Sequence, residues 1–343
     1  MHPSGRLILF GTRIGLNFSG GSNATVLLFQ HIIPHFEEVY LVCKELGEFP
    51  FREKVEVKYW KNENQALETL LSLNSTNSIY YGDFVDAKIL VKAELPFFFT
   101  YHDNWPEQKE LDESSRLLAK ERIDAYKEIF SAAIQVFSVS EFKRKFIQEA
   151  TDRHLLVRNG AFHPVHAFSP TKRETGKKFK VLMMGNLDKR KYQYALELFQ
   201  KIPPESNIEI HIYGHTVEKK IEQDLGEFPF VRIKGFKPRI DLRNYHLLLS
   251  CSFIENLPIS MLEALQNHTA VLSFEVGGIA ELVEHGKSGI LIKPFDIDEM
   301  LSQLWKIKKG VYSFSFPQSR YKDFNWENSA NLMVRQFRMY LHG

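Results

Sequence analysis

The sequence predicts an α/β protein built from two doubly wound parallel sheets. Short apolar runs alternate with helical patterns along the chain, beginning with an expected strand at Arg6–Phe10 and an expected helix at Ala24–Ile33. The run Leu95–Thr100 is almost entirely apolar, as in a central parallel strand that is buried on both faces. The 343 residues are enough for two domains, each with its own core.

The first half of the chain supplies one series of expected elements. Strands are expected at 6–10, 39–42, 55–59, 79–81, 95–100, 133–139 and 155–157. Helical patterns cover 24–33 and, as one long helix, 107–131, while 64–73 is a helical or loop stretch. Gly20 and Gly21 lie in a glycine-rich turn after the first strand, where backbone can approach a ligand closely. His102 follows a central strand, and open α/β sheets bind ligands beyond the carboxyl ends of their strands.

The second half repeats this alternation after a polar stretch at 169–178, which we interpret as a linker. Strands are expected at 179–184, 208–213, 231–233, 247–249 and 271–273. Helical patterns cover 258–267, 300–307 and 324–341. Asp296 and Asp298 precede the second of these helices, and we interpret them as part of a helix cap rather than as metal ligands.

The composition argues against several classes of protein. A hydrophobic content of 44% and a charged content of 25% are typical of a globular protein. The net charge of +2 gives no global reason to expect a nucleic-acid partner. No apolar run approaches the ~20 residues that cross a bilayer, and we expect no secretory signal at the start. Cys43 and Cys251 lie in apolar surroundings, so we expect core thiols and a reducing, cytoplasmic location.

The stretch Ser250–Gly289 contains a candidate anion site. Pro258 is expected in the first turn of a helix, with Asn256 as its cap. The unpaired amides at this helix start would face an anion, and they belong to Leu257, Ile259 and Ser260. Glu255 precedes the site and Glu263 lies inside the helix. Their carboxylates have acceptor oxygens that suit sugar hydroxyls better than phosphate.

This stretch resembles the retaining glycosyltransferases of the GT-B fold, in particular family 4 (group 1). The signature of that family is two glutamates separated by seven residues, a small-residue helix, a strand, and Gly-Gly with an acidic residue just after. The chain has these features in order, at Glu255, Glu263-Ala264, Val271–Ser273, Gly277-Gly278 and Glu281. The resemblance implies two Rossmann-like domains that face each other across a central cleft.

The resemblance also implies how the chain is divided. Residues 1–168 would form an acceptor-binding domain, and 169–178 the linker. Residues 179–320 would form the nucleotide-sugar-binding domain, and 321–343 a terminal helix that crosses back to the first domain.

For the donor diphosphate, the resemblance points to the motif that follows the strand at 179–184. Gly185 opens this motif and Lys191 matches the family's lysine, but Asn186 stands where the family has an arginine. A diphosphate leaving group gains charge in the transition state, so the loss of one cation matters. We expect Arg190 to supply the missing charge, because we expect a loop here and adjacent residues in a loop can both reach one ligand.

The other implied roles are distributed over both domains. Gly20 and Gly21 resemble a loop that faces the acceptor and the donor diphosphate, and His102 resembles a histidine that contacts the sugar near the reacting centre. Gly214 and Phe236 lie in loops that frame the nucleotide base. Glu255 would orient sugar hydroxyls, and Glu263 would hold the ribose diol.

The implied reaction is transfer of a hexosyl unit, with retention, from a UDP- or GDP-sugar to a hydroxyl of a saccharide or glycolipid. Synthesis of cell-surface polysaccharide, lipopolysaccharide or glycolipid would be its setting. We expect no metal, no other cofactor and no nucleic-acid partner. Lys143, Arg144 and Lys145 allow a peripheral contact with the inner membrane face, although three charges are few and we favour a solvated face.

Two alternatives from other classes stay open. The chain could be a catalytically weak GT-B partner subunit that binds nucleotide-sugar without turnover, which Asn186 favours. It could also be a nicotinamide-dependent oxidoreductase, because Rossmann-like folds serve both functions. The absence of a G-x-G-x-x-G motif after the first strand argues against the second alternative.

Overall fold

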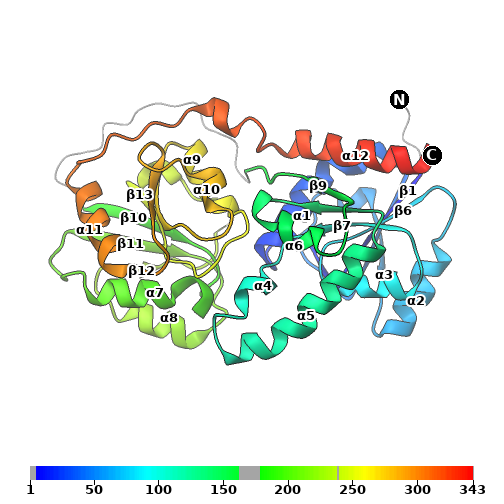
Figure 1. Cartoon of the computed structure of the whole chain (residues 1–343), viewed down its shortest axis with the longest axis horizontal. Coiled ribbons are helices and arrows are strands. Elements are labelled where there is room, and N and C mark those ends of the chain that lie inside the picture. The colour runs from blue at the N-terminus through cyan, green and yellow to red at the C-terminus, as the bar shows by residue number, and fades with distance from the viewer. Residues whose placement is uncertain (1–4, 162–177, 238, 343) are drawn as a thin grey trace. The chain divides into compact units, whose positions relative to one another are not determined.

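The computed structural model describes residues 5–161, 178–237 and 239–342. The chain divides into two compact units, one of Met1–Gly160 with Asp323–Gly343 and the other of Ala161–Lys322. The predicted linker at 169–178 lies outside the described residues, apart from Lys178. Each unit contains a parallel sheet with helices on both of its faces (Figure 1).

The sheet of the first unit has the strand order β5-β3-β1-β6-β7-β8-β9, with every pairing parallel. Its strands are β1 Arg6–Phe10, β3 Glu38–Cys43, β5 Glu56–Tyr59, β6 Ser78–Gly82, β7 Phe97–Tyr101, β8 Gln135–Ser138 and β9 His154–Leu156. A separate short pair is formed by β2 Arg13–Ile14 and β4 Glu45–Leu46. From β1 the chain winds outward to β3 and β5, then returns to β6 on the other side of β1. The switch point of this sheet therefore lies between β1 and β6.

The helices of the first unit form two layers. One layer contains α1 and α12, which pack together, and the other contains α2, α3 and α5 (Figure 1). The helices are α1 Gly20–Ile32, α2 Glu63–Ser72, α3 Lys88–Lys92, α4 Trp105–Gln108, α5 Glu113–Ala132, α6 Arg144–Gln148 and α12 Trp326–His342. Short 3-10 turns are η1 Ile33–His35, η2 Arg52–Lys54, η3 Val85–Ala87 and η4 Glu141–Lys143.

The single long helix expected at 107–131 is wrong, because the structure breaks it into α4 and α5. Asp112 accepts a hydrogen bond from the amide of Ser115 at 2.8 Å and so caps a new helix start. A cap residue has extended backbone, which interrupts the helix before it. The sequence carries this signal as Asp-x-x-Ser.

The phenylalanines of β7 explain why this strand is central. Phe97 and Phe99 point into the core under α5, whereas Phe98 points to the opposite face. There Phe98 meets Phe337 of α12, with ring centroids 4.6 Å apart. Both faces of the strand are buried, which confirms the interpretation of the apolar run.

The sheet of the second unit has the order β12-β11-β10-β13-β14-β15, again with every pairing parallel. Its strands are β10 Phe179–Met184, β11 Ile208–Tyr213, β12 Val231–Ile233, β13 Leu247–Ser250, β14 Ala270–Phe274 and β15 Gly289–Ile292. Renumbered in chain order, this is 3-2-1-4-5-6, the strand order of the doubly wound Rossmann fold. Its switch point lies between β10 and β13.

Helices again cover this sheet. α7, α8 and α11 pack side by side, while α9 and α10 lie on the other face (Figure 1). Their bounds are α7 Lys189–Gln200, α8 Lys219–Gly226, α9 Ile259–Gln266, α10 Ile279–Leu282 and α11 Ile297–Lys308, with 3-10 turns η5 Leu242–Asn244 and η6 Gln318–Tyr321. Asp296 caps α11 by accepting from the amide of Glu299, and Asp298 pairs with Lys201, which confirms the predicted helix cap.

The two cysteines confirm the core interpretation. Cys43 ends β3 and Cys251 follows β13, and both are buried free thiols. Burial raises the pKa of Cys43 to about 11. Such a thiol stays protonated and unreactive near neutral pH.

Candidate active site

In the second unit, the predicted donor residues gather at the switch point of the sheet. The segment after β10 begins at Gly185, and the segment after β13 leads to Glu255. Because β10 and β13 are neighbours and parallel, their carboxyl ends open at the same edge of the sheet. This is the position at which doubly wound sheets bind ligands.

A buried ion pair joins these two segments. The ammonium of Lys191, in the first turn of α7, lies 2.5 Å from Oε1 of Glu255. Burial raises the pKa of the Glu255 carboxyl, but the charges of Lys191 and then Arg190 outweigh this and leave its pKa below the usual value. Glu255 is therefore ionised at neutral pH.

Arg190 also contacts the segment after β13, at Ile254, the residue before Glu255. Its guanidinium donates to the backbone carbonyl of Ile254 at 3.2 Å and lies 3.7 Å from the Asp188 carboxylate. We expected a loop here, but α7 begins at Lys189, because the Asp188 side chain caps it by accepting from the amide of Lys191 at 3.0 Å. On a helix, adjacent side chains diverge by ~100°. Both cations nevertheless contact the segment after β13, Arg190 at Ile254 and Lys191 at Glu255.

Three glycines let the loops around this ion pair approach one another. A Cβ atom at Gly185 would lie 2.5 Å from Cδ of Lys191, and one at Gly214 would lie 1.9 Å from the carbonyl oxygen of Gly185. At Gly277, a Cβ would lie 1.7 Å from the carbonyl oxygen of Glu255. Real Cβ atoms do not approach this closely, so each position requires glycine.

The start of α9 differs in detail from the prediction. The helix begins at Ile259, and the residue at its cap is Pro258 rather than Asn256. The Pro258 carbonyl accepts from the amide of Met261 at 3.1 Å, which leaves Ile259 and Ser260 in the first turn. Proline precedes the helix here because its extended backbone, at ψ 115°, is that of a cap residue.

The other residues predicted to bind the donor lie around this helix start and after β10. Asn256 and Leu257 are buried just before it, with exposed fractions of 6% and 5%. Glu263 lies one turn into α9 and is 3% exposed. Asn186 follows Gly185, and its carbonyl accepts from the amide of Asp188 at 3.0 Å.

An aromatic pair lies beyond the carboxyl ends of β11 and β12. The rings of His215 and Phe236 stack with centroids 4.4 Å apart and planes 12° from parallel. The amide of Gly214 donates to the carbonyl of Gly235 at 3.2 Å, which ties the two loops together. Phe236 was predicted to be at the site, but His215 was not. A histidine directly after a strand-end glycine was the available signal.

In the first unit, Gly20 and Gly21 are not in a loop. They form the first turn of α1, which Ser19 and Ser22 close with a reciprocal capping box. The expected helix start at Ala24 is therefore wrong by four residues, because the serine pair caps the helix before the alanine. A Cβ at Gly21 would lie 3.1 Å from Cβ of His102, so this glycine makes room for the histidine.

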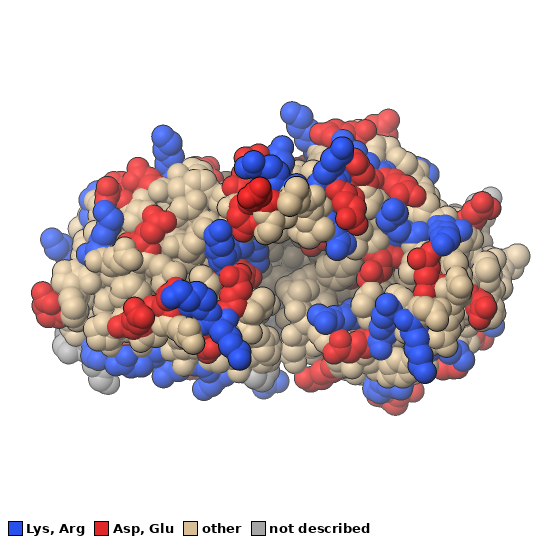
Figure 2. Space-filling model, turned by 90° about the horizontal axis from the view of Figure 1, so that it is seen from below, with Lys and Arg blue, Asp and Glu red and all other residues tan. Residues whose placement is uncertain are grey.

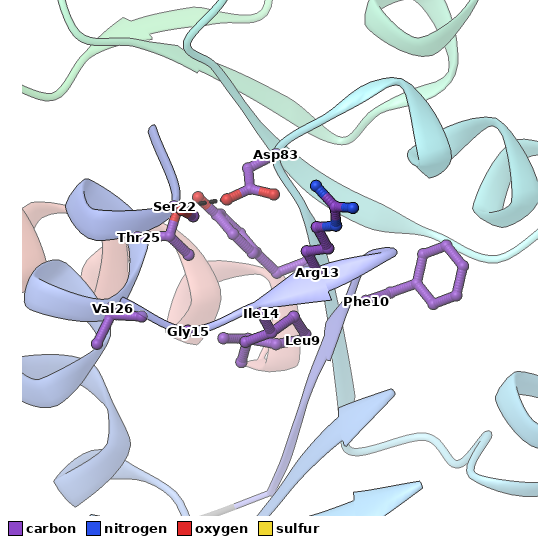
Figure 3. A pocket seen from close by; sticks show the side chains of 10 residues that line it. Leu9, Phe10, Arg13, Ile14, Gly15, Ser22, Thr25, Val26 and Asp83 are labelled. Carbon is purple, nitrogen blue, oxygen red and sulfur yellow. Dashed lines mark hydrogen bonds between the residues drawn. The ribbon is translucent and has the colours of Figure 1, made fainter. Parts of the chain in front are cut away.

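His102 lies at the carboxyl end of β7, beside two residues that the sequence analysis did not single out. Its Nε2 is 3.5 Å from Oγ1 of Thr25 in α1. Thr25 is in turn hydrogen-bonded to Asp83, which follows β6 (Figure 3). Burial lowers the pKa of His102 to about 4. Burial also raises the pKa of Asp83 to about 7, despite the hydrogen bond from Thr25. A polar residue at a strand's carboxyl end was the signal that could have identified Asp83.

A small cavity adjoins these residues at the switch point of the first sheet. It is lined by Leu9, Phe10, Arg13, Ile14, Gly15, Ser22, Thr25, Val26, Tyr81 and Asp83 (Figure 3). Its polar lining includes Thr25 and Asp83, which are 6% and 8% exposed. The predicted histidine therefore borders a cluster of buried polar groups.

The basic triplet at 143–145 does not form one surface. Lys143 is fully buried and pairs with Glu107 of α4, with its ammonium 4.5 Å from the ring centroid of Phe142. Burial lowers the pKa of Lys143 to about 8. The 3-10 turn η4 points this lysine inward, while Arg144 and Lys145 are exposed. Lys143 is thus excluded from the predicted membrane contact and from the solvated face.

On the face shown in Figure 2, Lys and Arg side chains are interspersed with Asp and Glu over both units. Among the described residues, no group of three or more His, Cys, Asp or Glu side chains could hold a metal ion. Within the same residues, no helix is long and apolar enough to cross a membrane.

The second unit matches a known family. Residues 167–310 fit the model described as glycosyl transferases group 1. These residues form a group 1 glycosyltransferase domain. The match includes the Lys191–Glu255 ion pair and the start of α9.

Two curated proteins are similar over parts of the chain. The amylovoran biosynthesis glycosyltransferase AmsK of Erwinia amylovora is 29% identical over 90 residues, which are 23% of this chain and 22% of that protein. The poly(ribitol-phosphate) alpha-N-acetylglucosaminyltransferase of Staphylococcus aureus (strain COL) is 25% identical over 126 residues, 34% of this chain and 26% of that protein. The chain thus spans about a quarter of the length of these relatives.

Solved structures resemble the whole chain. Sucrose-phosphate synthase from Thermosynechococcus elongatus has a TM-score of 0.80 at 16% identity, covering 98% of each chain. HepE of Anabaena, in complex with UDP, has a TM-score of 0.72 at 15% identity, covering 98% of this chain and 100% of that one. Likeness at such identities shows the fold, which is GT-B. The predicted fold class is confirmed.

Proposed function

We propose that this chain is a retaining glycosyltransferase of family 4 that moves a hexosyl unit from a UDP- or GDP-sugar to an acceptor hydroxyl. The observation that carries the proposal is the pair of cations, Arg190 and Lys191, held over Glu255 at the switch point of the group 1 domain. Cations placed there can neutralise a departing diphosphate. That HepE was solved with UDP also supports a nucleotide-sugar donor.

In the proposed reaction, the bond between the anomeric carbon and the diphosphate oxygen breaks as the acceptor oxygen bonds to the same carbon. The leaving phosphate takes the acceptor proton, so no protein nucleophile is needed. Lys191, Arg190 and the amides of Ile259 and Ser260 would stabilise the diphosphate. Glu255 would orient sugar hydroxyls, and His102 would contact the sugar near the reacting centre.

The donor would be held by the residues beside this ion pair. Glu263 would accept hydrogen bonds from the ribose diol, and the stacked His215 and Phe236 would border the base. Gly21, Gly185 and Gly214 would serve the site through close packing of backbone and side chains, whereas Gly20, with open space at its Cβ position, would face the substrate.

We propose a saccharide or glycolipid as the acceptor, in polysaccharide, lipopolysaccharide or glycolipid synthesis on the cytoplasmic side of a membrane. The similarity to glycosyltransferases for amylovoran and poly(ribitol-phosphate) supports this class. Arg144 and Lys145 would be the basic residues available for a peripheral membrane contact.

The experiment that tests the proposal is a thermal-shift screen of the full chain against UDP-, GDP-, ADP- and dTDP-sugars. A ligand that binds the native state raises its melting temperature, by an amount that grows with concentration over Kd. Release of nucleoside diphosphate is then measured with the selected donor. Absence of any shift over the panel would contradict the proposal.

A second candidate is a partner subunit that binds nucleotide-sugar without turnover, which Asn186 in place of arginine favours. Donor binding without release of nucleoside diphosphate, in the presence of a saccharide acceptor mixture, would support this candidate instead.

We also propose that transfer needs no divalent metal. The cations of Lys191 and Arg190 would take the place of a metal at the diphosphate. Activity that a chelator abolishes and Mn²⁺ or Mg²⁺ restores would contradict this proposal.

A further inference from the structure

Thr25 stands at the centre of a buried polar cluster in the first unit. The polar neighbours of its Oγ1 atom include the carbonyl oxygen of Gly21 at 3.1 Å, Oδ2 of Asp83, and Nε2 of His102 at 3.5 Å. Figure 3 shows Thr25 and Asp83 turned toward one another, from α1 and from the end of β6. At these levels of burial each hydrogen bond counts, because water cannot replace it.

The Thr25 hydroxyl has one hydrogen, and the group that accepts this hydrogen determines whether Thr25 donates to His102 or accepts from it. A hydroxyl has one hydrogen to donate and two lone pairs that accept. The Gly21 carbonyl accepts only, and so does the Asp83 carboxylate when it is ionised. The single hydrogen of Thr25 therefore goes to one of these oxygens, and its lone pair faces His102.

When Asp83 is protonated, its carboxyl O–H donates to Thr25, and the Thr25 hydrogen can go either to the Gly21 carbonyl or to Nε2 of His102. The ionised carboxylate removes this choice, because it accepts the Thr25 hydrogen itself. When Asp83 is ionised, Nε2 of His102 must therefore carry a hydrogen in order to bond to Thr25.

The ring of His102 is held against Thr25 by its surroundings. Gly21 lies one helical turn before Thr25 and leaves space for the His102 side chain. On another side lies Phe84, whose ring centroid is 6.0 Å from that of the imidazole. Burial lowers the pKa of the imidazole and keeps it neutral near pH 7. The remaining question is which of its two ring nitrogens carries the hydrogen.

We propose that Thr25 is a positioning residue that holds His102 in the Nε2–H tautomer, with Asp83 orienting the Thr25 hydroxyl. The accepting nitrogen of His102 is then Nδ1. This tautomer lets His102 accept a hydrogen bond through Nδ1 from a sugar hydroxyl, and that consequence rests on the proposed function. The 3.5 Å distance is long, and contacts of this kind shorten when the substrate binds.

The direct test uses NMR on the full chain with nitrogen-15-labelled histidine, at a pH above the pKa of Asp83, where its carboxyl is ionised. The two neutral tautomers give different nitrogen shifts and different couplings to the ring protons. His102→Gln identifies the His102 signals by their loss. We expect the Nε2–H pattern in the wild-type chain and in Thr25→Ser, which keeps the hydroxyl. The valine in Thr25→Val has nearly the shape of threonine but lacks the hydroxyl. We expect this variant to shift His102 toward the Nδ1–H tautomer.

Two results would overturn the proposal. One is an Nδ1–H tautomer in the wild-type chain. The other is a Thr25→Val spectrum in which His102 is unchanged, which would mean that Thr25 only bonds to the carbonyl one turn earlier, as helix threonines often do.

Turnover provides a second measurement. Thr25→Val should lower kcat by about 10-fold or more while KM for the donor changes by less than about 3-fold, and Thr25→Ser should stay near wild type. A wild-type kcat in Thr25→Val would contradict the role in catalysis. If the wild-type chain transfers no sugar, the proposed function fails, and the NMR result still decides the tautomer.

Discussion

The ammonium of Lys191 lies 2.5 Å from the carboxylate of Glu255, and this pair joins the first turn of α7 to the segment after β13. The two side chains are 16% and 10% exposed. A charge pair this well buried contributes little net stability when intact, but the loss of one partner leaves a buried charge without compensation. Comparing the stability and the donor affinity of variants at these two positions can therefore separate the structural role of Lys191 from its functional role.

Lys191→Met should destabilise the second unit by about 3 kcal/mol, because it leaves Glu255 buried and unpaired. Lys191→Met combined with Glu255→Gln should recover most of this loss, since no charge is then buried. Neither variant should bind the donor. Urea unfolding gives the stabilities, and titration with the selected nucleotide-sugar gives the affinities.

A matched control is Lys201→Met, which removes a lysine from a pair with Asp298 at 2.8 Å. Both side chains of that pair are largely exposed, at 47% and 82%. Its loss should change stability only slightly, by ~0.5 kcal/mol or less. Equal losses in the two lysine variants would mean that burial of the Lys191 pair has no energetic consequence.

Gly277→Ala should be much more destabilising than Gly286→Ala, although both glycines have positive φ, at 59° and 79°. A Cβ at Gly277 would meet the carbonyl of Glu255, whereas a Cβ at Gly286 has no heavy atom within 4 Å among the described residues. Gly286→Ala should cost about 1 kcal/mol for the backbone conformation alone. Gly277→Ala should cost at least about 2 kcal/mol more and also weaken donor binding, because Glu255 must move. Similar unfolding midpoints would disprove this.

Arg190→Ala should lower kcat by about 10–1,000-fold and change KM less, as expected when a cation acts on charge that develops in the transition state. Arg190→Lys should retain part of the activity, because it keeps the charge but loses the planar guanidinium that bonds to Ile254. Steady-state kinetics with the selected donor measure both variants. Wild-type turnover in Arg190→Ala would leave Lys191 and the amides of α9 as the anion site.

The fold could be predicted from the sequence because short apolar runs indicate where the buried parallel strands lie. β1, β10, β11 and β12 have the predicted bounds, and Glu263 lies inside the predicted helix that follows β13. The largest errors occur at helix starts. Ser19 caps α1, Asp112 caps α5 and Asp188 caps α7, each through one short side chain, and a serine or aspartate in the sequence does not by its type alone identify a cap.

The site was only partly predictable for a different reason. Lys191 and Glu255 were visible because each follows a strand on its own segment, but their pairing depends on which strands become neighbours. Thr25 gave no signal, because a threonine inside an apolar helix is ordinary. Only the packing of α1 beside β6 and β7 brings it to Asp83 and His102.

Asp83 and His102 should give the stability of the first unit two opposing dependences on pH. Burial raises the pKa of Asp83 from 3.8 to about 7, with the charges of Asp86 and Asp103 adding to this and the Thr25 hydrogen bond opposing it. Between these values the folded chain binds more protons at Asp83 than the unfolded chain. The contribution of Asp83 to stability is therefore fully present below pH 3.8 and is lost as the pH rises through 7.

For His102 the dependence of stability on pH has the opposite sign. Burial lowers its pKa from 6.5 to about 4, so the unfolded chain binds the extra proton and stability falls as the pH decreases across this window. In the wild-type chain the two slopes largely cancel. Asp83→Asn removes only the first, so its stability should rise with pH from 4 to 6.5 relative to wild type, by up to ~1.4 kcal/mol per pH unit. His102→Gln should show the opposite slope. Hydrogen exchange at the amides of β6 and β7 measures the opening free energy of this unit, and parallel pH curves for wild type and Asp83→Asn would show that Asp83 titrates alike in both states.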